Sequence, residues 1–251
     1  MRKVLACLAV ILLTIINYSP SFAQIKKKAV KKTVLHTSKT KVQPKTDSIS
    51  TEKFITEVRV KITTSLGDIV LKLSNKTPKH RDNFIKLVNE HFYDSLLFHR
   101  VINNFMIQGG DPNSKNALAG TLLGNGDIHY TIPAEFDTTL YHKRGALAAA
   151  RDNNPEKASS GCQFYIVQGK QVNGDELDII ELQKNIWFSA AKRMTYKMNG
   201  GTPKLDMNYT VFGEVETGME VVEKIITEQT DENNRPKTDV RMKMEVLKEI
   251  N

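Results

Sequence analysis

The residues from Phe98 to Pro112 are the densest group of side chains that could bind or act on a ligand, and they read FHRVINNFMIQGGDP. Successive side chains of a strand point to opposite faces, so we expect Arg100 to share a face with Phe98, and Met106 to share a face with Gln108. An arginine and a glutamine beside phenylalanine and methionine would form an apolar trough with a few fixed hydrogen-bond donors. Such a trough is typical of a groove for a small ligand or a peptide. An ordinary strand with a surface arginine explains the same pattern, so these residues alone leave both interpretations open.

Alternating apolar residues predict the strands that must hold this stretch in place. Residues 58–62 and 69–73 alternate in this way around the turn residues Ser65–Asp68, and the pattern returns at 240–246. Together with two well-separated helices and long glycine-containing loops, these short strands favour an antiparallel β-barrel closed by its terminal strands.

The starts of the two helices carry capping signals. Thr77 and Pro78 predict the N-cap and first position of one helix, where the missing N–H of proline costs nothing. Thr217 and Glu220 predict a capping box at the start of the other. We therefore expect one helix to begin at each place.

A third segment, at about 175–199, differs from the strand-rich remainder. Its apolar residues recur at helical spacing, so we expect an inserted helix or helical pair that lies on the barrel. Trp187 stands beside this apolar series, and we expect it to pack against the protein rather than contact a ligand.

The positive charge is concentrated outside the part that we expect to fold. Of the net charge of +8, residues 24–53 contribute nine lysines against two acidic residues, whereas 54–251 hold 25 basic and 26 acidic residues. A nucleic-acid-binding fold with its own basic face is therefore not expected. The 40% of hydrophobic residues excludes a wholly disordered chain, and two cysteines exclude a disulfide scaffold or a cysteine-rich zinc module.

The N-terminus predicts export. Residues 1–23 have a short basic start, an apolar run and the small residues Ser21 and Ala23, as in a secretory signal peptide cut after Ala23. The apolar run is shorter than the roughly 18–20 residues of a membrane span, although an uncleaved anchor stays open. Residues 24–53 then form a basic, flexible tether, and 54–251 form the folded domain. We expect a periplasmic protein, with secretion or membrane association as alternatives.

Five blocks of sequence, in this order, resemble those of the cyclophilin-type peptidyl-prolyl cis-trans isomerases. They are Phe98–Pro112, Tyr130–Phe136, Gly145–Ala150, Ser160–Ile166 and Leu205–Gly213. The resemblance covers about 57–250 and implies a mainly β fold, an eight-stranded antiparallel closed β-barrel with two capping helices. It also implies acceleration of X-Pro bond rotation, which would assist the folding of exported polypeptides.

The resemblance also implies the roles of individual residues. Arg100 would be the principal catalytic residue, assisted by Gln108, and neither a metal nor a cofactor is expected. The substrate-binding residues would be Phe105, Met106, Ala150, Arg151, Gln163, Tyr165, Leu205 and Tyr209.

Four positions depart from the family's usual residues. Lys204 stands where many members have an aromatic residue or histidine, so one wall of the pocket is expected to be open or charged. Tyr165 replaces a phenylalanine, Tyr209 a histidine and Arg151 an asparagine. Arg100 is retained, so we expect activity.

Two other classes of function remain as alternatives. Cys162 with His99, His129 or His142 would make a cysteine hydrolase, but Cys162 lies in an apolar run where free cysteine is often simply buried. A proline-peptide-binding module or chaperone with little turnover is the stronger alternative, and Lys204 is the residue that favours it.

The expected partners follow from these interpretations. We expect proline-containing polypeptides as substrates, no nucleic acid and a monomeric protein. The basic residues 24–53 leave open a weak electrostatic association with an anionic surface.

Overall fold

The computed structural model describes residues 57–248, and the predicted signal peptide (1–23) and tether (24–53) lie outside the described residues. Eight strands form one antiparallel sheet in the order β10-β1-β2-β9-β6-β8-β4-β3. Its members are β1 (Arg59–Thr64), β2 (Gly67–Leu73), β3 (Phe98–Ile102), β4 (Met106–Gly109), β6 (Ala146–Ala149), β8 (Phe164–Val167), β9 (Val211–Thr217) and β10 (Met242–Leu247). The short strands β5 (Thr131–Ile132) and β7 (Ser159–Ser160) pair separately. This confirms the expected mainly β, eight-stranded antiparallel fold.

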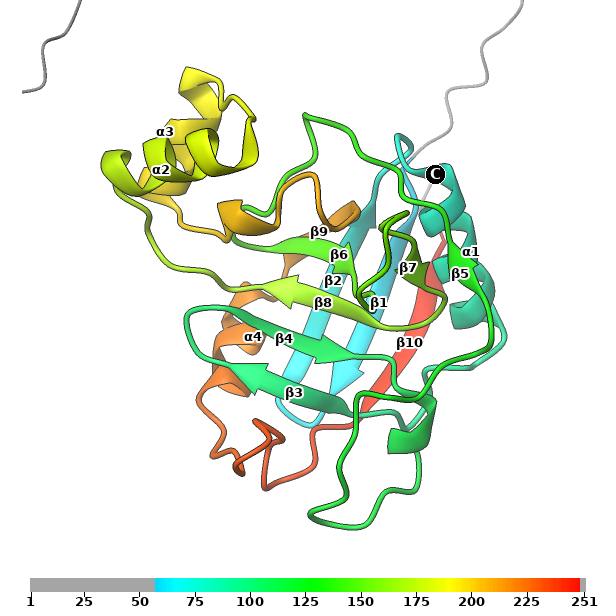
Figure 1. The fold of residues 1–251 in the computed structure, drawn as a ribbon. Helices are drawn as coiled ribbons and strands as arrows, with labels where there is room; N and C mark the ends of the chain where they lie inside the picture. Colours follow the sequence, from blue (N-terminus) through cyan, green and yellow to red (C-terminus); the bar gives the residue numbers. More distant parts are fainter. Residues whose placement is uncertain (1–56, 249–251) are drawn as a thin grey trace, which may run out of the picture. The chain divides into compact units, whose positions relative to one another are not determined.

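The sheet curls so that its two edges approach each other (Figure 1). The segments that precede β3 and β10 meet at an isolated bridge between Leu97 and Arg241. Backbone bonds from Phe98 N to Val240 O (3.0 Å) and from Met242 N to Leu96 O (2.9 Å) flank this bridge. The edges therefore touch over a short length, and the sheet stops short of the fully closed barrel that was expected.

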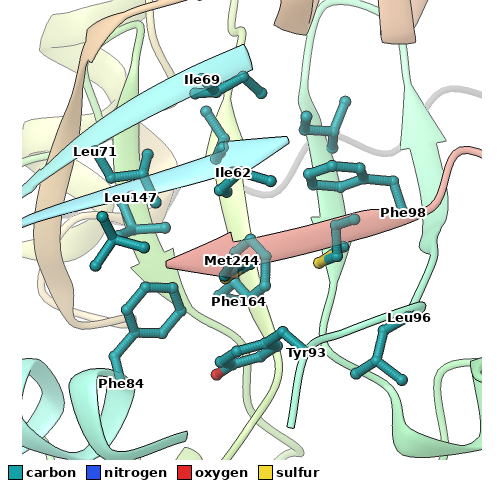
Figure 2. Packing of buried hydrophobic residues seen from close by; sticks show 14 of the residues in the cluster. Ile62, Ile69, Leu71, Phe84, Tyr93, Leu96, Phe98, Leu147, Phe164 and Met244 are labelled. Carbon is teal, nitrogen blue, oxygen red and sulfur yellow. The ribbon is translucent and has the colours of Figure 1, made fainter. Parts of the chain in front are cut away.

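The inner face of the sheet carries the main hydrophobic core, shown in Figure 2. Ile62, Leu147 and Phe164 are each at most 1% exposed there. Helix α1 (Pro78–Asn89) adds Phe84, whose ring meets that of Phe164 edge to face at 5.6 Å. Helix α4 (Met219–Ile226) covers another part of the same core, so the two capping helices are confirmed.

The start of α4 differs from the prediction. The expected capping box of Thr217 and Glu220 is wrong, because Thr217 still belongs to β9 and pairs with Val70 of β2. Gly218 takes the N-cap position instead, with a φ of +91°. A Cβ at Gly218 would lie 2.3 Å from Asp68 O, so this chain reversal requires glycine. At α1, Thr77 occupies the expected N-cap position without a capping bond from its side chain.

Helices α2 (Gly174–Lys184) and α3 (Ala190–Met198) occupy the segment with helical spacing and lie beside the 3-10 turn η2 (Pro203–Leu205) (Figure 1). They bury a small core of their own, made by Val172, Leu177, Ile180, Phe188 and Tyr196. The expected packing of Trp187 is wrong, since this residue is 85% exposed. Asn185 ends α2 with a φ of +50°, so the apolar period does not continue on one helix face from α2 to Trp187.

Candidate active site

A β-bulge in β3 directs Arg100 to the outer face of the sheet. Phe98 pairs with Gly109 and Arg100 with Gln108, so β3 has one residue more than β4 over this interval. Phe98 consequently points into the core while Arg100 lines a cavity on the other side. The expectation that Arg100 shares a face with Phe98 is therefore wrong, whereas Met106 and Gln108 do share a face.

The strand register places the polar residues of the site side by side. Gln108 is opposite Arg100 on β3 and opposite Tyr165 on β8. Tyr165 is in turn opposite Ala148 on β6. Directly opposed residues lie on the same face of a sheet, so one row crosses four strands from the guanidinium to a small, buried alanine.

A chain of hydrogen bonds fixes the orientation of these side chains. Arg100 Nη1 donates to Gln108 Oε1 at 3.2 Å, and Gln108 Nε2 donates to Gln163 Oε1 at 2.9 Å. Gln163 Nε2 donates to the carbonyl oxygens of Gly124 (2.9 Å) and Gly126 (2.8 Å). The arginine is therefore held at one end of a network whose other end is anchored in a loop.

A cavity of about 290 Å³ lies beside this network. It brings together nine of the ten predicted site residues, namely Arg100, Phe105, Met106, Gln108, Ala150, Arg151, Tyr165, Leu205 and Tyr209. Gln163 lines an adjoining cavity of about 550 Å³, which shares Gln108 and Ala150 with the first. The result is a groove with an apolar pocket at one end, next to a charged guanidinium.

The wall opposite the strands is formed by loop residues. The Arg151 guanidinium lies 4.8 Å from the centre of the Tyr209 ring, and its Nε donates to Asn208 O at 2.9 Å. Lys204 does not line the cavity, because its side chain is 71% exposed and lies 4.0 Å from Glu176 of α2. The charge that was expected at this wall is therefore directed away from the pocket.

Three residues that line this cavity were not among the predicted site residues: His99, Gly124 and Asn125. Asp111 explains how the last two reach the groove, because its carboxylate accepts hydrogen bonds from Asn113 N (2.7 Å) and from Gly124 N. An aspartate after two glycines is the signal that could have indicated an anchored loop.

Burial sets the ionisation of the groups around the pocket. It lowers the pKa of His99 to about 4, so this ring is neutral at pH 7. It also lowers the pKa of Arg100 from its ordinary value, although a guanidinium stays charged. The Arg100 guanidinium is therefore a fixed positive charge in the site, and a second guanidinium, that of Arg151, lines the same cavity.

Cys162 is buried in the main hydrophobic core, in an environment that disfavours a nucleophile. Burial raises the pKa of its thiol to about 11, and its Sγ lies 3.8 Å from Ser160 Oγ. His142 bonds to Asp206 and Tyr165 instead, and the side chain of His129 is 95% exposed. This arrangement does not support the cysteine-hydrolase alternative.

Residues 57–248, the part of the chain that the structure describes, hold neither a metal-binding cluster nor a membrane-spanning helix. Between residues 57 and 248, no cluster of three or more His, Cys, Asp or Glu side chains could hold a metal ion. Over the same residues, no helix combines the length and apolar character needed to cross a membrane.

Known proteins are similar to this chain in sequence. The family model described as cyclophilin type peptidyl-prolyl cis-trans isomerase/CLD matches residues 59–246. A protein of Staphylococcus aureus named as a peptidyl-prolyl cis-trans isomerase is 35% identical over 73% of this chain and 88% of its own length. A protein of Streptococcus pyogenes named as a bifunctional phosphatase/peptidyl-prolyl cis-trans isomerase is 38% identical over 72% of this chain, which spans only 37% of that relative.

Solved structures give the same fold. A cyclophilin-type isomerase of Cryptosporidium parvum superposes with a TM-score of 0.56 at 23% identity, covering 77% of this chain and 99% of its own. A second structure of that protein was determined in the presence of the dipeptide Ala-Pro. The fold and pocket thus define a cyclophilin-like protein. The chain belongs to the cyclophilin-type peptidyl-prolyl cis-trans isomerase family, which confirms the resemblance seen in its sequence.

Proposed function

We propose that this isomerase acts on X-Pro bonds of exported polypeptides and that Arg100 lowers the barrier to their rotation. The observation that carries the proposal is the Arg100 guanidinium, which Gln108 holds at the edge of a pocket lined by Phe105, Met106 and Leu205. The presence of Ala-Pro in one cyclophilin structure supports proline-containing peptides as the substrate class.

The chemistry of the reaction explains why a fixed cation is useful here. Rotation about a peptide bond meets a barrier of about 18–20 kcal/mol, because resonance gives the C–N bond partial double-bond character. In the twisted transition state this resonance is lost, and the prolyl nitrogen becomes pyramidal and basic. A guanidinium beside that nitrogen donates a hydrogen bond to it in the transition state only. Gln108 occupies one of the guanidinium's five N–H donors, so others remain to make this contact.

The two adjoining cavities bind different parts of the substrate. The apolar pocket takes the proline ring, while Gln108, Gln163 and the backbone near Ala150 hold the flanking peptide in the larger cavity. One part of the substrate is thereby fixed and the other is free to rotate. Removing about 7 kcal/mol from the barrier in this way would give roughly a 10⁵-fold acceleration.

The test follows cis-to-trans relaxation of an X-Pro peptide, which takes tens to hundreds of seconds without catalyst. We expect the whole chain to accelerate it and Arg100→Ala to lose roughly 10²–10³-fold in rate, as when one donor to a developing charge is removed. Arg144→Ala is the control, because Arg144 pairs with Glu223 and lines neither cavity. A folded protein that binds the peptide without accelerating relaxation would instead support the binding-module alternative.

Export is a separate part of the proposal and rests on the leader-like residues 1–23 and the lysine-rich residues 24–53. We expect a periplasmic monomer that begins at Gln24. Cell fractionation, followed by mass measurement of the purified protein and its sedimentation, would test this. A chain found in the cytoplasm with residues 1–23 still attached would contradict it.

A further inference from the structure

Both helices of the α2–α3 segment contact the short stretch that carries Leu205, one of the pocket residues. From α2, Lys184 Nζ donates to the carbonyl oxygens of Lys204 (2.7 Å) and Asp206 (2.6 Å), which flank Leu205 on either side. From α3, Lys192 Nζ lies 2.8 Å from Asp206 Oδ2. The backbone on both sides of Leu205 is therefore held by side chains that come from outside the sheet.

The same aspartate links α3 to the floor of the pocket. Tyr196 of α3 donates its hydroxyl hydrogen to Asp206 Oδ2 at 2.7 Å. His142 Nδ1 lies 2.8 Å from the other carboxylate oxygen, and His142 Nε2 lies 2.9 Å from the hydroxyl of Tyr165. A carboxylate only accepts hydrogen bonds, so Nδ1 carries the hydrogen, and Nε2 accepts from Tyr165. We call these four residues, Tyr165, His142, Asp206 and Tyr196, the relay.

Every member of the relay is buried, with exposure of 5% for Tyr165, 1% for His142, 2% for Asp206 and 0% for Tyr196. Burial lowers the pKa of His142 and outweighs the opposing effect of Asp206, so the imidazole is neutral. Burial also holds the pKa of Tyr165 well above its usual value. The proton positions required by the geometry are therefore those expected near pH 7.

Buried hydrogen bonds of this kind restrict the geometry of their members. A buried polar group that loses its hydrogen-bond partner destabilises the protein, so each relay residue holds its neighbours in one arrangement. Tyr165 of the relay lines the 290 Å³ cavity, and so does Leu205, the residue that precedes Asp206 of the relay. A change inside α3 should therefore alter the positions of the pocket residues Tyr165 and Leu205.

We propose that α2 and α3 are a positioning element of the isomerase site, and that they set the shape of the proline pocket through Lys184, Lys192 and the relay. This inference rests on the proposed function, because it assumes that the pocket receives the proline ring. It assigns a role in catalysis to a helical segment that lines no part of the cavity.

The test compares two tyrosines at the same helix–barrel contact. Tyr196→Phe removes one hydroxyl from the relay, whereas the control Tyr141→Phe removes a hydroxyl that bonds to Thr195 (3.2 Å) and not to Asp206. We expect Tyr196→Phe to raise the KM for an X-Pro peptide by about 2- to 10-fold with little change in kcat, as for loss of one hydrogen bond. We expect Tyr141→Phe to leave both constants as in the wild type.

A second pair keeps the test decisive if Tyr196→Phe folds poorly. Lys184→Met removes the two bonds to the carbonyls around Leu205, and Lys197→Met changes an exposed lysine of α3 as its control. The KM should rise with the first variant only. In a Tyr165→Phe background, the effect of Tyr196→Phe on KM should shrink, because the relay is already cut at its pocket end.

The outcomes separate this inference from the proposed function. An active wild type whose KM is unchanged by both Tyr196→Phe and Lys184→Met overturns the inference and leaves the isomerase site standing. Effects on the unfolding temperature without effects on KM overturn it as well, since they show a purely structural role. A wild type without turnover overturns the proposed function, and this inference with it.

Discussion

The two faces of strands β4 and β8 contribute to different parts of the molecule although they belong to the same short segments. On the inner face, Ile107 and Ile166 pair with each other and are 0% exposed in the main core. On the outer face, Gln108 pairs with Tyr165, and both line the pocket. Neighbours in the sequence thus have different roles: Ile107 contributes to the core, and Gln108 contributes to the site.

This difference shows how the fold separates two requirements. The inner face needs only apolar volume, which the main core supplies. The outer face can then carry polar side chains such as Arg100 and Gln108, which would be destabilising inside an apolar core. Substitutions on the two faces should accordingly have effects that barely overlap, and four measurements can test this separation.

The largest effect is expected at the inner residue Ile107. Ile107→Ala leaves a cavity in the closed core and should lower the free energy of unfolding by about 2–5 kcal/mol. Turnover per folded molecule should stay near that of the wild type, because Ile107 lines neither cavity. Urea unfolding and the relaxation assay on the same sample measure both quantities. A large loss of turnover in the folded fraction would contradict the expectation that the inner face affects stability and not catalysis.

The bulge residue His99 should make the protein sensitive to acid. Its pKa is lowered to about 4 by burial, so the unfolded chain takes up a proton near its ordinary pKa while the folded protein does not. The contribution of neutral His99 to the free energy of unfolding is therefore retained above about pH 6.5. It is lost progressively as the pH drops, by about 2 kcal/mol at pH 5. The loss between pH 7 and pH 5 should be smaller in His99→Gln. Equal losses in the two proteins would show that His99 is not the group responsible.

Gln108 should show the opposite pattern from its neighbour Ile107. Gln108→Ala removes a hydrogen bond from the charged guanidinium of Arg100 and a neutral one to Gln163, so turnover should fall by about 10-fold. The free energy of unfolding should change little, since this residue is only half-buried. A stability loss as large as that of Ile107→Ala would contradict the account.

The smallest effect is expected at Cys162. Its thiol has a pKa of about 11 and is 3% exposed, so it should react slowly with an alkylating reagent at pH 8 in the folded protein and rapidly in urea. Cys162→Ala should keep the relaxation rate of the wild type. Loss of turnover in this variant would revive the cysteine-nucleophile alternative.

The strand-borne part of the site was predictable from the sequence because it depends on local alternation and on recognisable blocks. Met106 and Gln108 lie on one face as their spacing requires, and Arg100 reaches the pocket as the family resemblance implies. Alternation alone nevertheless placed Arg100 with Phe98, because a bulge depends on the register with the partner strand. That register depends on how β3 pairs with β4, and the alternation within one strand does not contain it.

The loop-borne part was less predictable for a related reason. Leu205 was placed by resemblance, but the backbone around it is held by Lys184, and the next residue, Asp206, by Tyr196. Both side chains are brought near only when α2 and α3 fold. Trp187 shows the same limit, because its neighbours suggested packing while the break at Asn185 leaves it exposed. Periodicity describes a single helix and does not describe how two short helices turn against each other.

The most direct test of the central claim measures binding and turnover together in Arg100→Ala. Titration with a proline-containing peptide gives the dissociation constant, and relaxation of the same peptide gives the rate. If Arg100 acts on the twisted state, the rate falls by roughly 10²–10³-fold while the dissociation constant stays close to that of the wild type. Turnover that survives the substitution, or a loss of affinity as large as the loss of rate, would contradict the claim.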